Sequence, residues 1–131
     1  MSFAQFEVST GASEEVVDIT EKVSEMADES GVKEGICLVY APHATAAVII
    51  NELEPNIERD YVKFFARFVP KGDYAHNQID DNAEAHLKSA FFGSGKCVPI
   101  KDGKLALGTW QSIMLCEFDG PRKRRVIVVV K

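Results

Sequence analysis

The chain has 131 residues, 46% of them hydrophobic, and a formal net charge of -5 at pH 7. This length allows one domain over residues 1–131 to bury a single core without disulfides or a structural metal. The acidic balance excludes a general affinity for nucleic acid or for an acidic membrane surface, because binding to phosphates draws on a surplus of lysine and arginine.

The cysteines and the hydropathy pattern indicate the compartment. Cys37, Cys97 and Cys116 are odd in number, far apart and without CxxC spacing, which favours reduced thiols in an intracellular protein. We expect Cys37 and Cys116 in the core. No segment approaches the roughly 18 apolar residues of a membrane span, and the first ten residues do not resemble a signal peptide. We therefore predict a cytoplasmic protein with no membrane partner.

The first half of the chain alternates between strand and helix patterns. Residues 3–10 show the period-two pattern of a half-buried strand. A helix follows, with Asp18 or Thr20 as its cap, Gly31 at its end and an apolar face of Ile19, Val23, Met26 and Ala27. Residues 35–41 and 46–50 are apolar on both faces, so we expect strands that are covered on each side.

Two further helices are expected in the middle of the chain. The first opens at Pro55, is ended by Pro70 and Gly72, and carries an aromatic stripe expected in the core, made of Ile57, Tyr61, Phe64, Phe65 and Phe68. The second begins with the pattern of a capping box between Asp81 and Glu84. Its core face is predicted to be Ala83, Leu87, Ala90 and Phe91, with Asn82, His86 and Ser89 on the adjoining face.

The remainder of the chain is predicted to be strands and turns. The segments are residues 96–100, 105–107, 111–118 and 124–130, the last of them an interior strand. Together the elements predict the α+β class: a single domain with a twisted, mostly antiparallel or mixed sheet that two or three helices cover.

The three histidines are the first candidates for chemistry. His76 and His86 bracket an acidic stretch that contains Asp80 and Asp81, and His43 lies where an apolar strand gives way to a loop. Histidine titrates near neutral pH and is a common metal ligand when neutral, so the set indicates either a metal site or acid–base chemistry. For any one histidine, a surface or packing role is the alternative.

Glu117 is a second candidate. It shares a strand face with Gln111, Ile113 and Leu115, which places a carboxylate at the end of an apolar row. A buried carboxylate needs an arginine, a histidine or a metal as its partner. Arg122 is the nearest cationic candidate along the chain, and an exposed strand end is the alternative.

A set of short motifs, taken in order, resembles the YjbQ-like family. The motifs are PHAT (42–45), INE (50–52), His76, DDNAEAHLKS (80–89), LGTWQ (107–111) and EFDGPRKR (117–124). The family consists of small bacterial and archaeal proteins associated with a secondary thiamine-phosphate synthase activity. The resemblance covers nearly the whole chain, and it implies an α+β domain that assembles as a homotrimer and gathers the motif residues into one pocket.

The resemblance also implies roles for individual residues. It implies catalysis by His76, Asp81, His86 and Glu117, and binding of substrate or phosphate by Thr45, Asn51, Asn82, Gln111 and Arg122; Glu52 and Trp110 lie in the same motifs. His43, His76 and His86 become candidate ligands of a zinc-type divalent ion. Relatives commonly carry a hydroxyl residue after the first histidine, whereas this chain has Ala44.

Two functions remain open from the sequence. The first is an enzyme that acts on a small phosphorylated metabolite, with transfer onto a thiazole phosphate to give thiamine phosphate as one reaction. The second is a trimeric protein that binds a metal or a phosphate-bearing ligand without catalysis.

Overall fold

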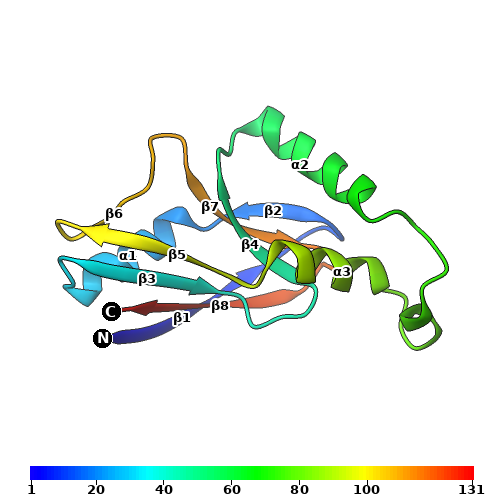
Figure 1. The fold of residues 1–131 in the computed structure, drawn as a ribbon, viewed down its shortest axis with the longest axis horizontal. Helices are drawn as coiled ribbons and strands as arrows, with labels where there is room; N and C mark the ends of the chain where they lie inside the picture. The colour runs from blue at the N-terminus through cyan, green and yellow to red at the C-terminus, as the bar shows by residue number, and fades with distance from the viewer.

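The chain folds into two antiparallel sheets and three α-helices in the computed structural model, which describes residues 1–131 (Figure 1). The larger sheet has the strand order β1 (Ser2–Ser9), β8 (Lys123–Val130), β3 (Gly35–Tyr40), β5 (Gly95–Lys101) and β6 (Lys104–Leu105). The smaller sheet has the order β2 (Glu15–Asp18), β7 (Ser112–Glu117) and β4 (Ala46–Asn51). The α+β class is confirmed, but the strands divide between two sheets instead of one.

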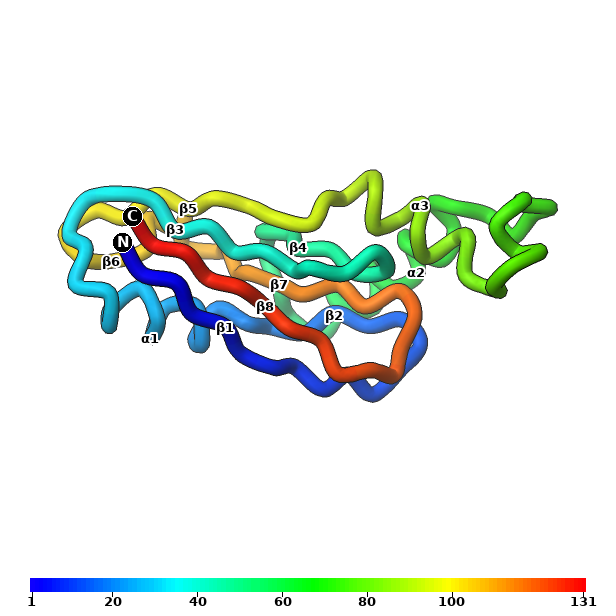
Figure 2. Tube along the Cα trace, turned by 90° about the horizontal axis from the view of Figure 1, so that it is seen from below, coloured from blue at the N-terminus to red at the C-terminus, as the bar shows by residue number.

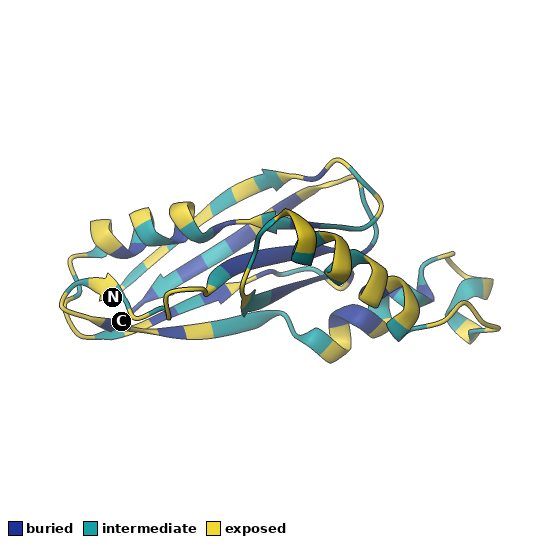
Figure 3. Cartoon of the chain, turned by 90° about the horizontal axis from the view of Figure 1, so that it is seen from above, coloured by how far each residue is buried: buried dark blue, intermediate teal, exposed yellow.

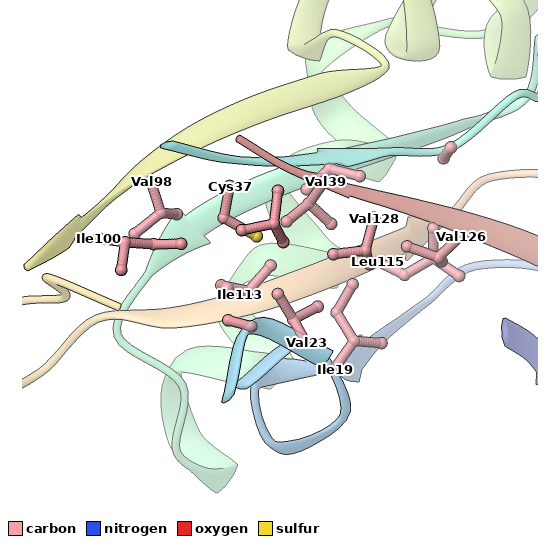
Figure 4. Close-up of a cluster of buried hydrophobic side chains, with 14 of the residues drawn as sticks. Ile19, Val23, Cys37, Val39, Val98, Ile100, Ile113, Leu115, Val126 and Val128 are labelled. Atoms are coloured by element: carbon pink, nitrogen blue, oxygen red, sulfur yellow. The ribbon is translucent and has the colours of Figure 1, made fainter. Parts of the chain in front are cut away.

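The main core lies between the two sheets. Alternate residues of β8, namely Val126, Val128 and Val130, are at most 1% exposed and belong to the same buried cluster as Ile113 and Leu115 of β7. Figure 4 shows Val126 and Val128 beside Leu115 in this cluster. Cys37 lies in this core and Cys116 is buried on the other face of β7, as expected for both. Strand β7 is therefore buried on both faces, and this places Glu117 at the end of its inner row.

Helix α1 (Thr20–Ser30) packs at one end of this core. Asp18 Oδ1 accepts a hydrogen bond from the Thr20 backbone N–H at 2.9 Å, and Gly31 ends the helix with a φ of 73°, which a residue without Cβ adopts at little cost. Val23 and Ala27 are buried as predicted. Strand β2, which precedes α1, was not predicted, because its four residues are too few to establish a period.

Helices α2 (Pro55–Phe68) and α3 (Ala83–Phe92) cover the outer face of the smaller sheet. Pro55 begins α2 as predicted. The aromatic stripe was predicted to lie wholly in the core, but only Phe65 is buried and Phe64 is 49% exposed. The stripe extends past the edge of the sheet, so its outer rings stack on α3, where Phe68 and Phe91 lie 4.6 Å apart between ring centroids.

The predicted orientation of α3 is wrong. Leu87, Ala90 and Phe91 are exposed, and the buried residues are Ala83, Ala85, Lys88 and Ser89. The physical reason is a close approach of α3 to β4: the Ser89 hydroxyl donates to the Ala46 carbonyl oxygen at 2.5 Å. Small side chains permit this approach, whereas leucine and phenylalanine would hold the helix away from the strand.

The predicted capping box is also absent. The N-cap of α3 is Asn82, whose side chain makes no capping bond. Instead Asn77 Oδ1 accepts from the Ala83 backbone N–H at 2.9 Å. Asn77 belongs to a short 3-10 helix, η1 (Ala75–Gln78), within the segment that joins α2 to α3 and extends beyond the ends of the sheets (Figure 2).

The outer face of the larger sheet carries no helix and is open in the single chain: it is turned toward the viewer in Figure 2, whereas Figure 3 shows the opposite side, where α2 lies over the smaller sheet. Phe3, Ile36 and Tyr40 on this face are 66%, 52% and 41% exposed. Strand β8 is interior as predicted, between β1 and β3, but the expectation that β3 is covered on both faces does not hold within one chain. None of the three helices combines the length and the apolar sequence needed to cross a bilayer.

Candidate functional site

Four polar side chains form one hydrogen-bonded chain at the end of the smaller sheet. His76 Nε2 lies 2.8 Å from Asn82 Oδ1, and Asn82 Nδ2 donates to Asp119 Oδ2 at 2.9 Å. Arg122 Nη2 donates to the same Asp119 oxygen at 2.9 Å, and Arg122 Nε donates to the Asp119 carbonyl oxygen at 2.6 Å. The loop before α3 and the turn after β7 are thereby joined.

The direction of the hydrogen bonds between His76, Asn82 and Asp119 sets the tautomer of His76. An ionised carboxylate only accepts hydrogen bonds, so Asp119 requires the NH₂ group of Asn82 and turns its carbonyl oxygen toward His76. Since that oxygen also only accepts, His76 Nε2 carries the proton. In the neutral imidazole, Nδ1 is then the nitrogen that can take up a proton or bind a metal.

His86 lies against His76. It follows Asn82 by one helical turn, and the two imidazole rings are 4.6 Å apart between centroids at an interplanar angle of 72°. Both rings line a cavity of about 450 Å³, together with Tyr74, Ala75, Ala83 and Leu87. The adjacent rings are therefore consistent with the sequence prediction that His76 and His86 share a site.

The turn that carries Asp119 and Arg122 is fixed by buried polar groups. The Asp119 backbone N–H donates to Glu117 Oε2 at 3.0 Å, and the Arg122 backbone N–H donates to the Thr10 hydroxyl at 2.8 Å. A Cβ at Gly120 would lie 2.2 Å from the Ala12 carbonyl oxygen, so only glycine fits there. The turn is thus held by β1 and β7 together.

Glu117 is fully buried and its partner is Arg124. Arg124 Nε donates to Glu117 Oε1 at 2.8 Å, and Arg124 Nη2 donates to Glu117 Oε2. Arg122, the partner suggested by proximity in the sequence, bonds Asp119 instead. Burial alone would raise the pKa of the Glu117 carboxyl, but hydrogen bonds from Arg124, the Asp119 amide and Thr10 outweigh burial and lower it.

Thr45 and His43 are bound to the same part of β8. The Thr45 hydroxyl accepts from Arg124 Nη2 at 2.8 Å, and His43 Nε2 accepts from the Arg125 backbone N–H at 2.8 Å. Burial and the nearby charge of Arg124 lower the pKa of His43. A neutral His43 that accepts at Nε2 carries its proton on Nδ1, so neither nitrogen offers a free lone pair in this arrangement.

The three histidines do not form one group within the chain. No cluster of three or more His, Cys, Asp or Glu side chains lies in an arrangement that could hold a metal ion. His76 and His86 are adjacent, whereas His43 completes the hydrogen bonding of β8. A catalytic zinc site takes three protein ligands, so the residues of a single chain fit such an ion only in part.

Other motif residues lie at the far end of the smaller sheet. Strands β4 and β7 pair from Ala46 with Glu117 to Asn51 with Ser112, which separates the two ends by roughly 17 Å at the rise of a strand. Asn51 and Gln111 are exposed and bond only backbone N–H groups, of Glu52 and Gly108, while the Trp110 side chain is 73% exposed. One chain therefore does not gather all motif residues into one pocket.

A second cavity, of about 530 Å³, lies on the other side of Asn82 and Asp119. Asp81 and Glu84 line it, as does Lys88, which is 4% exposed and forms an ion pair with Glu14 at 2.9 Å. Lys88, Asp119 and Arg124 were not predicted as site residues. All three lie in the motifs that carry the family resemblance. Arg124 had a further signal, because it is in phase with the inward residues Val126, Val128 and Val130.

Comparison with known proteins places these features in one family. The family model described as UPF0047 protein YjbQ-like matches residues 4–131. A UPF0047 protein of Archaeoglobus fulgidus is 48% identical over 115 residues, covering 87% of this chain and 89% of the relative. The Bacillus subtilis protein YugU is 38% identical, with 90% of each chain covered.

Solved structures agree with the sequence relatives. A crystal structure of a YbjQ-like protein of unknown function from Sulfolobus solfataricus has a TM-score of 0.96 at 43% identity, covering 98% of this chain and 95% of that one. A hypothetical protein from Aeropyrum pernix has a TM-score of 0.97 at 41% identity, covering 100% and 98%. The chain belongs to the UPF0047 family of YjbQ-like proteins.

Proposed function

We propose that this protein is an enzyme that acts on a small phosphorylated metabolite at the site formed by His76 and His86. One observation carries the proposal: the hydrogen-bonded chain from His76 through Asn82 and Asp119 to Arg122, with His86 against the first ring. An imidazole with a fixed tautomer, held by an amide that a carboxylate orients, is suited to general acid–base catalysis near neutral pH.

Each group has a place in this proposal. His76 Nδ1 accepts a proton from the substrate. His86 exchanges a second proton with the substrate or orients it from the same cavity. Arg122 binds the phosphate: two of the five N–H groups of its guanidinium bond Asp119, which leaves three for phosphate oxygens. Asp81 lines the adjoining cavity, where it would contact the substrate, and its catalytic role stays a prediction. Both oxygens of Glu117 accept hydrogen bonds from Arg124. This arrangement does not test the predicted proton-transfer role of Glu117, which stays a prediction.

Formation of thiamine phosphate is a specific reaction of this class that the family resemblance suggests. In it, the nitrogen of a thiazole phosphate attacks the methylene carbon of an aminopyrimidine donor. The bond from that carbon to the diphosphate oxygen breaks as the new N–C bond forms, and diphosphate leaves. Arg122 stabilises the charge on the leaving group.

The test is turnover by purified protein. The wild type is incubated with the thiazole phosphate and the aminopyrimidine diphosphate, and thiamine phosphate is quantified after oxidation to its fluorescent thiochrome product. His86→Ala is expected to lower turnover by about 10²–10⁴-fold and to keep the thermal unfolding profile. Gln78→Ala, at an exposed residue of the preceding segment, is the matched control.

The outcomes separate the two candidate functions. Binding of phosphate esters without turnover of any would favour the non-catalytic ligand-binding protein. Normal turnover by His86→Ala would refute the site assignment.

As an alternative to proton transfer at this site, we further propose that a divalent ion such as zinc binds at His76 and His86, because the one free lone pair of His76, on Nδ1, holds either a proton or a metal. Imidazole nitrogens suit zinc, and the bound ion would supply Lewis-acid stabilisation of a phosphate oxygen. Two ligands are fewer than a catalytic zinc site takes, so the third would come from the substrate or from a second copy of the chain. Elemental analysis of untagged protein tests this: His86→Ala should lose the metal, and equal metal in His86→Ala and wild type would exclude the site.

We also propose that the protein is a homotrimer. The open apolar face that carries Phe3, Ile36 and Tyr40 supports assembly, because monomeric proteins seldom leave large contiguous apolar surfaces in water. Assembly would also give Asn51 and Gln111 of one copy a route to the histidines of another. The trimer and the cytoplasmic location remain predictions.

A further inference from the structure

The cavity of about 530 Å³ beside the histidine site is lined mainly by polar residues. It lies between the end of α2, the start of α3 and the loops that precede β2 and follow β7, and only four of its fourteen lining residues are hydrophobic. Asn82 and Asp119 line it as well as belonging to the chain that orients His76. A molecule in this cavity would therefore adjoin the proposed catalytic group.

Lys88 is the buried cation of this cavity. It is 4% exposed, its Nζ donates to Glu14 Oε2 at 2.9 Å, and the Phe118 ring centroid lies 5.9 Å from Nζ. An ammonium has three N–H donors, and Glu14 is the only acceptor that the chain supplies. Because burial makes an unused donor costly, the remaining N–H groups favour a ligand that brings hydrogen-bond acceptors.

The rest of the lining adds acceptors and another donor. The carboxylates of Asp81 and Glu84 take part in no ion pair, so they favour groups that donate. Asn77 uses its carbonyl oxygen on α3, which leaves its NH₂ group as a donor. Buried Lys88 and partly buried Asn77 thus favour a ligand that brings acceptors, whereas the carboxylates of Asp81 and Glu84 favour one that brings donors.

The donors and acceptors of the cavity lining together favour one chemical class of ligand. A phosphate group has only acceptors at neutral pH and would face four carboxylates against two lysines, so the cavity disfavours it. An organic ammonium brings only donors, so it would leave the free N–H groups of Lys88 and Asn77 without acceptors. A hydroxyl group donates one hydrogen bond and accepts two, so a neutral group that carries several hydroxyls satisfies both halves of the lining.

We propose that this cavity binds the polyhydroxylated, polyol-like or sugar-like part of the substrate, with Lys88 as its buried donor. The inference rests on the proposed function, in which the phosphate of the same molecule lies outside the cavity at Arg122. Lys88 is then a binding residue that selects the hydroxylated substrate, and the Glu14 pair keeps its ammonium in place before the substrate enters.

The test compares two phosphate esters that differ only in hydroxyl groups. Glycerol 3-phosphate and n-propyl phosphate are titrated into the full chain by calorimetry. We expect glycerol 3-phosphate to bind at least about tenfold more tightly, because a site built to bond hydroxyls loses those bonds with the propyl ester. The double variant Glu14→Gln with Lys88→Met should bind both esters equally, with its affinity for the propyl ester unchanged.

Controls separate this inference from the proposed function. Lys63→Met, at an exposed lysine of α2 outside the cavity, should keep the preference, and Arg122→Ala should weaken both esters alike. Glu84→Ala removes a partly exposed acceptor, so it should lower the preference even if the double variant fails to fold.

Equal affinity of the wild type for the two esters would overturn the cavity assignment and leave the phosphate site at Arg122 intact. A preference retained by both cavity variants would overturn it as well. Binding of neither ester would overturn this inference together with phosphate binding at Arg122, whereas the proposed function is refuted separately, by normal turnover of His86→Ala in the assay above.

Discussion

The Asn82 side chain donates its amide N–H to Asp119 Oδ2 at 2.9 Å, across 37 positions of the sequence. Asp119 accepts from Arg122 through the same oxygen. This bond decides the orientation of the amide, and the amide decides which nitrogen of His76 carries the proton. The protonation pattern of His76 is therefore controlled by a residue that it does not touch.

Replacement of Asp119 by Asn should remove this control. An amide at position 119 accepts or donates, so Asn82 is free to turn over and present its NH₂ group to His76. The wild type should show the Nε2–H tautomer of His76 in ¹⁵N NMR, which resolves three histidines with little overlap. In Asp119→Asn we expect a mixture of tautomers and a loss of activity of about 10–100-fold, as for other residues that orient a catalytic ligand.

The matched control is Asp73→Asn, at an exposed acid of the segment between α2 and α3. It should leave both the ¹⁵N shifts and the turnover unchanged. An unaltered His76 tautomer in Asp119→Asn would show that another group fixes the imidazole.

Glu117 and Arg124 form the second relationship with a measurable consequence. Glu117→Ala leaves the Arg124 guanidinium, 4% exposed, without its carboxylate. Loss of one partner of a buried ion pair is strongly destabilising, so we expect the free energy of unfolding to fall by about 3–5 kcal/mol. Urea denaturation measures this fall, and Glu52→Ala, at an exposed acid, is the control.

The double variant Glu117→Met with Arg124→Leu provides the complementary test. It removes both charges together, so it should recover much of the stability that Glu117→Ala loses. A double variant as unstable as Glu117→Ala would mean that the bonds from Thr10 and the Asp119 amide, and not the ion pair, carry the effect.

The sequence predicted those features that repeat along one element. The period-two rows of β1 and β7 predicted these strands and placed Glu117 at the end of an apolar row, and the apolar run of residues 124–130 predicted β8 as an interior strand. The same rule predicts that Arg124 points inward with Val126, and applying it would have found the partner of Glu117. Proximity along the chain favoured Arg122 instead, and proximity is a weak guide where a turn redirects the backbone.

Other features depend on contacts between distant segments. The burial of Ser89 and Lys88 follows from how closely α3 approaches β4, and no periodicity within α3 contains that information. The placement of Asn51 far from the histidines follows from the pairing of β4 with β7, and the bond between Asn82 and Asp119 joins segments 37 positions apart. A motif identifies such residues as a set without showing which of them meet.

The partly buried His43, whose pKa is lowered in the fold, predicts a dependence of stability on pH. Its pKa is lower in the folded chain than in the unfolded one, so the unfolded chain binds more protons in the window between these two values. This contribution to stability is fully present above the unfolded pKa, near 6.5, and is lost as the pH falls through the folded pKa. Unfolding free energies measured from pH 8 to pH 5 should decline accordingly.

The variant His43→Gln isolates the contribution of His43 to this pH dependence. Its side-chain oxygen reaches the Arg125 backbone N–H as an acceptor and does not titrate, so the decline should become shallower. The lowered pKa of Glu117 adds a loss of stability at more acidic pH, below the usual range of a glutamate, and this loss should persist in His43→Gln. If the wild type and His43→Gln showed the same decline in unfolding free energy between pH 8 and pH 5, titration of His43 would not contribute to stability in that window.

The open face of the larger sheet gives a prediction about assembly. Ile36, which is 52% exposed on that face, should be buried in the proposed trimer, so Ile36→Glu would place a carboxylate in an apolar interface. Light scattering coupled to size exclusion should find three copies for the wild type and a lower mass for Ile36→Glu. Lys63→Glu, at an exposed lysine of α2, adds the same acid away from this face and serves as the control. If the wild type elutes as a monomer, the apolar face has another partner, and the histidine site must be complete within one chain.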